Sequence, residues 1–568
     1  MSKRELEVTR VPAYHLLDEK TKIQVHWEQV WAQACPYSSL GKHYKNRLLP
    51  FGPNDRIAWQ EEMNAVKQMR IALEDRDFAE TLRNRLQSLR PVEQQLALLV
   101  KGMPLRVVDF FEIKQFLWTG RGLQESLREK QILFSWMTDV DWERLLRLLN
   151  PSAELKPDFS IDDGYDPRLA QLRNACDEVR AEIRKMRKEL YDVLHARYGR
   201  LPNREGEYIW DKNDRDMLAL ANEDRSLIRQ AENAWEVIFR IVDSTDIEKL
   251  KEKEQVLMEQ LEAVEKEVLQ EISRHFLPEV DRLRQVHQAF GRLDWLVAKS
   301  EWANRWKAVE PKWNEWGWLI EDAVHPWIEK QVCEKGGRYT PLSLTFQRGV
   351  GVVTGPNMGG KSVALKTMAL LQGLAQYGFH VPVRAYTFRP VERIRFLGGD
   401  EQTSEHGLSS FGGEVKRLVD ILGETGEGLF LMDEVARTTN PQEGEAIAVG
   451  LVRHLLTTEH SAFVATHFAA VAKVPGIQAY RVIGLAHEKK EEIRLHQAGD
   501  MLVQLQQAMD YRIVPLRTER EQVPQDALWI AEHLGLPKAI IRYGRTHLGE
   551  QLDLHAANST PKDRQVSH

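Results

Sequence analysis

Apolar residues recur at the three- and four-residue steps of a helix through much of the first 150 residues. One run stops at Pro91 and resumes beyond it, with Leu82, Leu86, Leu89, Leu96 and Leu99 as its members. Few stretches alternate between apolar and polar residues as a half-buried strand does. The pattern therefore predicts a helical core, which we place at residues 1–165.

A longer helical pattern follows a stretch with three prolines between Pro151 and Pro167. Apolar residues alternate between three- and four-residue steps from Leu169 to Val193, which is the seam of a heptad repeat. The same rhythm returns from Ile247 to Val268, apart from Glu254. The two segments predict an antiparallel coiled coil joined through a tip of about forty residues.

The second of these segments carries its own helix start. Ser244-Thr245-Asp246 stands just before it, and serine is among the residues that cap helix N-termini. At about 1.5 Å per residue, the paired helices would extend for about 40 Å. We place this arm, its tip and the return of the chain to the core at residues 166–320.

Short apolar runs typical of buried strands mark three places in the second half of the chain, at 352–354, 429–432 and 462–466. The first run leads into the segment Gly355-Pro356-Asn357-Met358-Gly359-Gly360-Lys361-Ser362. These eight residues fit the phosphate-binding pattern G-x-x-x-x-G-K-[ST] in every fixed position. Val363 to Gln376 is helix-like, so the order is the strand, loop and helix that the motif requires.

Each residue type in this loop has a physical role. Glycines let consecutive backbone N–H groups turn toward phosphate oxygens, and the helix that follows presents its positive end to the same anion. Lys361 would reach the β and γ phosphates, and Ser362 would place its hydroxyl on a magnesium ion. We therefore predict ATP and Mg²⁺ as cofactors, with ATP bound by Gly355, Pro356, Asn357, Met358, Gly359, Gly360, Lys361 and Ser362.

Two later strand ends supply the residues that hydrolysis needs. Asp433 and Glu434 follow the second apolar run, where Asp433 would bind magnesium and Glu434 would orient and polarise the attacking water. His467 follows the third run and is placed to hydrogen-bond the γ phosphate. An acidic pair at a strand end can also simply meet solvent, and a lone histidine is more often structural. Their order after the loop favours an ATPase, with Glu434, His467 and Lys361 as catalytic residues and Ser362 and Asp433 as metal ligands.

Several segments resemble the MutS family, the ABC-type ATPases of DNA mismatch repair. The similar segments are Thr354–Ser362, His325-Pro326, Tyr377–Pro382, Ser409-Ser410-Phe411 with Glu414, Leu431–Glu434 and Ala465–Phe468. The resemblance implies an α plus α/β multidomain fold: the all-helical core and coiled-coil arm, then an ABC-type P-loop α/β ATPase domain at 321–500. It also implies C-terminal helices for dimerisation at 501–554, and we expect a disordered tail at 555–568.

In the MutS family two ATPase domains face each other, which implies a homodimer. The resemblance makes Ser409 and Ser410 candidates for contacting the γ phosphate held by the partner copy, although the same serines would also suit an N-cap before the following helix. The family usually continues after its Asp-Glu pair with Gly-Arg-Gly-Thr, whereas this chain has Ala436-Arg437-Thr438-Thr439. We expect a short, divergent member in which phosphate and magnesium ligands are retained.

The sequence leaves open whether such an ATPase acts on DNA or on another protein. In MutS relatives the arm ends in a clamp that closes on DNA, yet residues 197–240 carry eight Lys or Arg against nine Asp or Glu, and phosphate binding favours a positive excess. Leu16–Lys20 resemble the family's helical core, so we expect the mismatch-recognition domain to be missing. Two functions remain: a dimeric DNA clamp related to mismatch repair or recombination, or a protein-remodelling ATPase such as the reactivating subunit of a cobalamin-dependent aminomutase.

Bulk composition narrows the class of protein. The chain has 568 residues, 42% of them hydrophobic, and a formal net charge of −6, which suits several folded domains. A run of eighteen apolar residues is missing, so we expect a cytoplasmic protein with no membrane partner. The three cysteines, Cys35, Cys176 and Cys333, are far apart, which argues against a disulfide framework or a zinc cluster.

Overall fold

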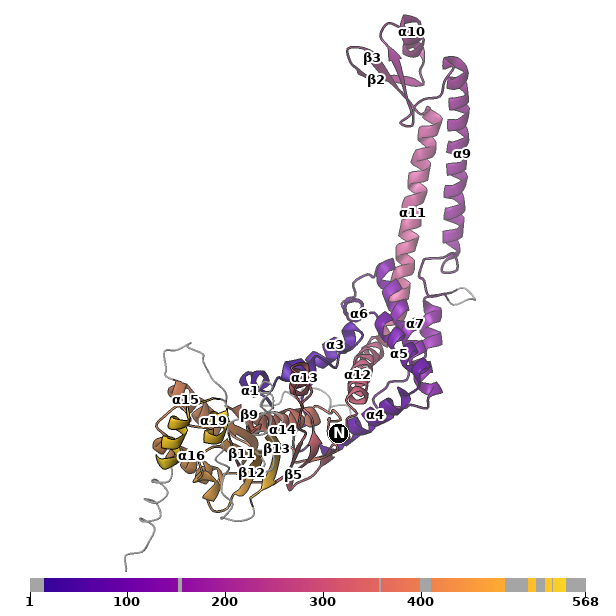
Figure 1. Cartoon of the computed structure of the whole chain (residues 1–568). Coiled ribbons are helices and arrows are strands. Elements are labelled where there is room, and N and C mark those ends of the chain that lie inside the picture. Colours follow the sequence, from indigo (N-terminus) through magenta and orange to yellow (C-terminus); the bar gives the residue numbers. More distant parts are fainter. Residues whose placement is uncertain are drawn as a thin grey trace, which may run out of the picture. The chain divides into compact units, whose positions relative to one another are not determined.

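The computed structural model describes residues 15–151, 156–356, 359–398, 410–485, 509–516, 527–533 and 535–547 (Figure 1). It confirms a mixed protein of helices and sheets. The chain divides into two compact units, the first formed by Met1–Asn84, Lys130–Phe134 and Gly291–His568 and the second by Arg85–Glu129 and Ser135–Phe290. The predicted helical core at 1–165 is therefore distributed over both units, and each unit is described by itself.

The second unit is mainly helical. Its helices are α6 (Glu93–Val100), α7 (Val107–Glu129), α8 (Trp142–Leu148), α9 (Pro167–Tyr198), α10 (Arg215–Glu223) and α11 (Thr245–Phe276). Helix α5 (Arg76–Ser88) enters this unit, and α12 (Val280–Arg305), which follows the short 3₁₀ turn Leu277–Glu279, leaves it. The cluster of Lys114 with Leu149, Asn150 and Asp158 fixes α7 to the segment after α8, because the buried ammonium donates to one oxygen of each.

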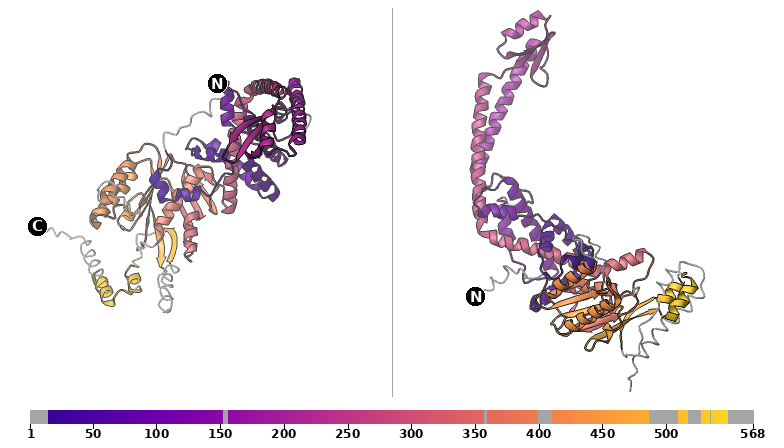
Figure 2. Two further views of the ribbon diagram at one scale, coloured as in Figure 1. Left: turned by 90° about the horizontal axis from the view of Figure 1, so that it is seen from above. Right: turned by 90° about the vertical axis from the view of Figure 1, so that its left-hand side faces the viewer.

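Helices α9 and α11 run antiparallel and side by side (Figures 1 and 2). Ion pairs join them at three levels, Arg168 with Glu267 at 2.7 Å, Arg173 with Glu265 at 2.9 Å and Arg180 with Glu254 at 2.6 Å. Apolar side chains of the predicted seam, including Val179, Ile183 and Ile247, pack between them. Glu254, the polar exception in that seam, is thus paired with an arginine. The Ser244 side chain caps α11 by accepting from Ile247 N at 3.3 Å, which confirms the predicted helix start.

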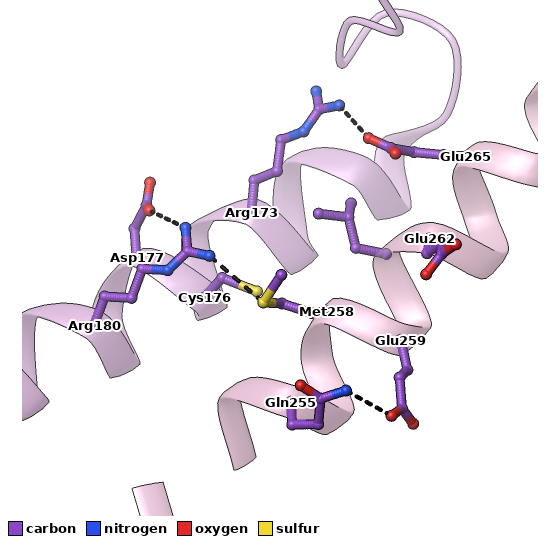
Figure 3. A pocket seen from close by; sticks show the side chains of 10 residues that line it. Arg173, Cys176, Asp177, Arg180, Gln255, Met258, Glu259, Glu262 and Glu265 are labelled. Carbon is purple, nitrogen blue, oxygen red and sulfur yellow. Dashed lines mark hydrogen bonds and ion pairs between the residues drawn. The ribbon is translucent and has the colours of Figure 1, made fainter. Parts of the chain in front are cut away.

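A hollow of about 520 Å³ lies between α9 and α11. Figure 3 shows Cys176 and Met258 facing it from opposite helices, with Arg180 Nη2 3.6 Å from Met258 Sδ. Cysteine is shorter than the leucines of the predicted seam, so the two helices do not fill the space between them at this level.

A small folded tip connects α9 to α11. Its antiparallel sheet has the order β1-β3-β2 and is formed by β1 (Glu207–Asp211), β2 (Leu227–Glu232) and β3 (Glu236–Ile241). One face of the sheet buries Tyr208, Trp210 and Phe239 against Tyr198 at the end of α9. The tip therefore has a core of its own, because alternate residues of each strand point to the same side.

The first unit is built on a six-stranded sheet with the order β13-β12-β7-β11-β10-β9. Its strands are β7 (Val350–Thr354), β9 (Arg393–Leu397), β10 (Gly428–Asp433), β11 (Ser461–Thr466), β12 (Gln478–Leu485) and β13 (Met509–Pro515). All neighbours are parallel except β12 and β13. Every residue of β7 and β11 is buried, as expected of parallel strands covered on both faces. The three predicted strands are confirmed.

Helices cover both faces of this sheet. Helix α14 (Lys361–Gln376) packs on one face through Leu365 and Met368, against Leu431 and Phe463 among others. Helix α16 (Pro441–Leu455) contributes Val452 and its neighbours to the core on the other face. Further helices of the unit are α1 (Glu19–Gln24), α2 (Trp27–Trp31), α3 (Ser39–Asn46), α4 (Arg56–Ala72), α13 (Pro326–Glu334), α15 (Ser410–Leu422) and α19 (Ala527–His533), with residues 538–547 also helical.

A second sheet with the order β4-β8-β5-β6 joins the same core. Its strands are β4 (Lys312–Trp313), β5 (Gly317–Ala323), β6 (Leu342–Gln347) and β8 (Ala385–Phe388). The N-terminal segment meets the edge of the larger sheet at β9, where Ile394 N donates to Leu16 O at 2.7 Å and Phe396 N to Thr21 Oγ1 at 2.9 Å. Residues from the start of the chain thus complete a sheet formed by its second half.

The described parts of the chain lack two further features. None of the helices there is both long enough and apolar enough to cross a membrane. The same residues contain no cluster of three or more His, Cys, Asp or Glu side chains arranged for a metal ion. Cys35, Cys176 and Cys333 are free thiols.

Candidate functional site

The predicted site residues follow the carboxyl ends of neighbouring strands. In the sheet register Thr354 of β7 lies opposite Thr466 of β11, and Asp433 of β10 lies opposite Ala465. Because the three strands are parallel, the residues that follow them emerge at one edge of the sheet. Gly355, Glu434 and His467 therefore start from the same edge, which is where open α/β sheets bind ligands.

The loop after β7 depends on glycine at its two ends. Gly355 has φ 154° and Gly360 has φ 76°, and an added Cβ at Gly355 would lie 2.9 Å from Val482 Cβ. Glycine adopts such conformations without steric cost. Gly360 is the N-cap of the sixteen-residue helix α14, so the loop leads directly to a helix N-terminus suited to an anion. Of the predicted ATP ligands, Asn357 and Met358 lie outside the described residues.

Lys361 is held inside the loop. Its Nζ donates to Gly355 O at 2.8 Å and to Pro356 O at 3.0 Å, and it lies 3.8 Å from Glu434 Oε1. The side chain is only 3% exposed. Burial lowers the pKa of Lys361, while the carboxylates of Glu434 and Asp433 act in the opposite direction. The ammonium is thus fixed beside the backbone groups that would bind phosphate.

Asp433 places a carboxylate with an unused oxygen beside this lysine. Its Oδ1 is buried and accepts no hydrogen bond from any residue that the structure describes. The pKa of Asp433 is raised by burial and by the charge of Glu434, and the opposing effects of the Ser362 hydroxyl, Lys361 and Lys366 only reduce this rise. A buried acceptor without a partner is costly, and hydroxyl and carboxylate oxygens are ligands that Mg²⁺ prefers. Ser362 and Asp433 therefore fit a magnesium ion.

Glu434 is fixed by its backbone and by two cations. Its N–H donates to Ala465 O at 2.9 Å, and its carboxylate lies between Lys361 Nζ at 3.8 Å and Arg437 Nη1 at 3.5 Å. The residue has φ 54°, in the left-handed region that non-glycine residues rarely adopt. Strained backbone of this kind is often found at functional sites. The arrangement holds a carboxylate next to the phosphate loop.

The structure describes fewer contacts for His467 and for Ser409 and Ser410. His467 follows β11 at the same edge and is exposed, with its ring centroid 4.2 Å from that of Phe468. Ser410 is the first residue of α15, but its side chain lies outside the described residues, as does all of Ser409. The predicted contacts of these serines with a partner copy remain a prediction.

Four residues around the site escaped the sequence analysis or were given no role there. Glu414 of α15 accepts a hydrogen bond from Ala436 N at 2.6 Å, just beyond Glu434. Lys366 lies one helical turn after Ser362 and interacts with Asp433. Gly398 and Gly444 allow close packing against Asp433 and Ala436. These roles depend on contacts between distant segments. Only one weak signal in the sequence pointed to them, the acidic residue Glu414 in the segment that resembles the MutS signature.

Comparison with known proteins gives one family match and a set of relatives. Residues 351–548 match the family described as MutS domain V. Endonuclease MutS2 of Lactiplantibacillus plantarum is 26% identical over 97% of this chain and 68% of the relative. Endonuclease MutS2 of Pelotomaculum thermopropionicum is 24% identical over 94% of this chain and 65% of the relative. Endonuclease MutS2 of Pediococcus pentosaceus is 36% identical over 36% of this chain and 26% of the relative. The chain thus spans at most 68% of the length of these relatives.

Proposed function

The chain belongs to the MutS family, and on that premise we propose that it binds ATP and hydrolyses it to ADP and phosphate. The observation that supports this most strongly is the meeting of Lys361, Asp433 and Glu434 at one edge of the six-stranded sheet, with Lys361 Nζ 3.8 Å from Glu434 Oε1. We assign this activity to an ATPase domain at residues 321–500.

The phosphates would be bound by the loop and by the start of α14. The loop would turn backbone N–H groups toward the phosphate oxygens, and the helix N-terminus would add its positive end. Lys361 would bind the β and γ phosphates, since the carbonyl groups of Gly355 and Pro356 already hold its ammonium at the loop. The same ammonium balances the charge of Glu434.

Ser362 and Asp433 would hold magnesium. When bound, magnesium neutralises negative charge that develops on the phosphate oxygens. Asp433 offers its buried Oδ1, which lacks a hydrogen-bond partner among the described residues. Lys361 and Lys366 partly offset the rise of its pKa, which burial causes. This part of the proposal rests on the donor set of the two side chains.

Glu434 would orient the attacking water and accept its proton as the bond between the β-phosphate oxygen and the γ phosphorus breaks. Its position is supported by the bond from its backbone N–H to Ala465 O and by the two neighbouring cations, Lys361 and Arg437. His467 starts from the same edge of the sheet and would hydrogen-bond the γ phosphate. Residues of this chain would therefore bind the phosphates, balance their charge and position the attacking water.

We further propose a homodimer that acts on DNA in a process related to repair or recombination. Family membership and the relatives named Endonuclease MutS2 support this. In the dimer, Ser409 and Ser410 of one copy would contact the γ phosphate held by the other, and residues 501–554 would contribute helices to the dimer. The alternative client is a protein. The tip of the arm, residues 197–240, carries eight basic and nine acidic side chains and so lacks the positive excess that phosphate binding favours.

The decisive test of the ATPase is the substitution Glu434→Gln in the full chain. We expect it to bind ATP with magnesium about as tightly as the parent while turnover falls by about 100-fold or more, because the amide cannot accept the proton from water. Binding is measured by equilibrium titration and turnover by phosphate release. Glu459→Gln is the matched control, since Glu459 is exposed and precedes β11 at the opposite edge of the sheet. A parent without ATP affinity, or Glu434→Gln with normal turnover, would contradict the proposal.

The effect of DNA on ATP turnover distinguishes a DNA client from a protein client. We expect duplex or branched DNA to change the ATP turnover of the parent, and the effect to weaken as salt is raised, because counterion release contributes much of the affinity of DNA-binding proteins. The measurement is steady-state phosphate release at several salt concentrations, with Glu434→Gln as the background. A turnover that DNA leaves unchanged at every salt concentration would favour the protein client.

A further inference from the structure

The loop that follows Glu434 has two non-glycine residues in the left-handed region. Glu434 has φ 54° and Ala436 has φ 61°. Each such residue costs roughly 1–2 kcal/mol relative to ordinary backbone. The MutS family usually has glycine at the second position, where the conformation is free of this cost. In this chain the surrounding structure must therefore hold the loop in place.

The side chain of Glu414 makes two contacts that hold the loop after Glu434. Its Oε1 accepts from Ala436 N at 2.6 Å, and its Oε2 lies 3.4 Å from Thr438 Oγ1. A carboxylate that accepts a backbone N–H forms a charge-assisted hydrogen bond, which is roughly twice as strong as a neutral one. One side chain thus binds the loop at two points, and the first of them is the strained residue itself.

Helix α16 also lies close to this loop. An added Cβ on Gly444 would lie 2.6 Å from Ala436 O, so glycine at this position lets the helix approach the loop backbone. Ala436 is thereby fixed at its N–H by α15 and confined at its carbonyl by α16. These contacts leave the loop little room to relax while Glu414 is present.

Helix α15 is itself anchored, which makes it a firm base for Glu414. Arg417, three residues after Glu414, forms an ion pair with Asp18, the N-cap of α1. Arg417 also lowers the pKa of Asp18, against the raising effect of burial. Ile421, one further turn along, is fully buried. Glu414 therefore connects the loop to a helix that is held at its middle and its end.

We propose that Glu414 is a positioning residue for hydrolysis: by binding the strained loop at Ala436 and Thr438, it holds Glu434 where its carboxylate can orient the attacking water. The inference rests on the proposed ATPase function. Glu414 is proposed to act through the loop and not by contact with ATP, because its hydrogen bonds among the described residues are to Ala436 and Thr438. Since α15 begins at Ser410, one turn before Glu414, the same helix carries a predicted contact of the partner copy and the support of Glu434.

Shortening or removing the Glu414 side chain should impair turnover without impairing ATP binding. Lys361, Ser362 and Asp433 are positioned by other segments, so KM and the ATP dissociation constant should stay within about twofold of the parent. The turnover number of Glu414→Ala should fall by about tenfold to 100-fold, the range expected when a catalytic group is displaced by about 1 Å. Glu414→Asp retains the charge but loses the reach to Ala436 N and should show a similar loss.

Two further variants distinguish positioning from a general structural role. Glu414→Gln keeps an oxygen at the same reach and should retain turnover within about threefold of the parent. The double variant with Glu414→Ala and Ala436→Gly should recover much of the lost turnover, because glycine adopts φ 61° without strain. Asp420→Ala is the matched control, since Asp420 is an exposed acidic residue of the same helix.

The experiment measures turnover number, KM, ATP affinity and thermal unfolding for the full-length variants. The inference is overturned if Glu414→Ala and Glu414→Asp turn over ATP like the parent, or if they lose ATP affinity together with turnover. It is also overturned if Ala436→Gly gives no recovery. A parent that does not hydrolyse ATP, or a Glu434→Gln variant that does, instead contradicts the proposed function, so the two failures are distinguishable.

Discussion

At the scale of single residues, the site depends on close approaches that only glycine allows. Gly398 follows β9 with φ 156°, and an added Cβ would lie 2.5 Å from Asp433 Cβ and 3.1 Å from Asp433 O. Both the backbone conformation and the space around this position therefore favour glycine. Because Asp433 is a proposed magnesium ligand, Gly398 has a direct influence on where that carboxylate lies.

We expect Gly398→Ala to displace Asp433. The new methyl group cannot be accommodated without movement of β9 or β10, which should cost about 1–3 kcal/mol of stability and raise the magnesium concentration needed for half-maximal turnover. The measurements are denaturant unfolding and a magnesium titration of ATP turnover. Gly450→Ala is the matched control, because an added Cβ there meets no atom within 4 Å. That control should be neutral or more stable by about 1 kcal/mol, since alanine is the better helix former. An unchanged magnesium dependence in Gly398→Ala would contradict the expectation.

At the scale of elements, the sequence predicted what local patterns determine. The strand before the phosphate loop, the helix after it, the strands that lead to Asp433 and His467, and the start of α11 all depend on short stretches of residues. The order of the strands and the approach of Leu16 to Ile394 depend on contacts between distant segments. For that reason the sequence predicted the strand ends that carry the site but gave no role to Glu414, whose contact with Ala436 joins distant segments.

A buried charge cluster joins α4, α12 and the turn after α14. Glu62 of α4 forms ion pairs with Arg292 and Lys299 of α12, and Lys299 Nζ also donates to Gly378 O at 3.0 Å. Burial raises the pKa of Glu62, but the two cations outweigh it and lower the pKa to about 2. Since this value lies below the usual 4.5, the carboxylate stabilises the fold at neutral pH and loses that contribution as pH falls from about 4.5 toward 2.

Glu62→Gln should therefore be strongly destabilising at neutral pH. Lys299 would keep its buried position without a carboxylate partner, and breaking a buried pair in this way costs about 3–5 kcal/mol. The difference between variant and parent should shrink as pH falls below about 4.5, because Glu62 then binds a proton in the unfolded parent but not in the folded parent, whose pKa for this group is about 2. The measurement is urea unfolding between pH 7 and about pH 2.5, which covers most of the interval between the two pKa values. Glu61→Gln, at an exposed neighbouring position on α4, is the control. A difference that stays constant across this pH range would show that the carboxylate charge is not the cause.

At the scale of the whole molecule, α12 is one of two helices that lie partly in each unit, the other being α5. Helix α12 begins at Val280 in the second unit and ends at Arg305 in the first, which starts again at Gly291. In the first unit its Lys299 contacts Gly378, two residues after the end of α14. Helix α14 begins at Lys361, the proposed phosphate ligand. The nucleotide loop is therefore connected to α12 through α14 and the hydrogen bond from Lys299 to Gly378 O, and α12 itself continues into the second unit.

If ATP acts on both units, its binding should alter the protection of α12 on both sides of Gly291. We expect the Glu434→Gln variant, saturated with ATP and magnesium, to exchange its α12 amide hydrogens more slowly both before and after this residue, because a bound phosphate fixes α14 and, through Gly378 and Lys299, the helix that both units share. Hydrogen exchange measured by mass spectrometry resolves the two halves of α12 as separate peptides. Lys361→Ala, which should not bind ATP, is the control and should show no change on adding nucleotide. A change confined to residues 291–305 would mean that α12 does not carry the effect of ATP into the second unit, and the arm would then respond to nucleotide by another route or not at all.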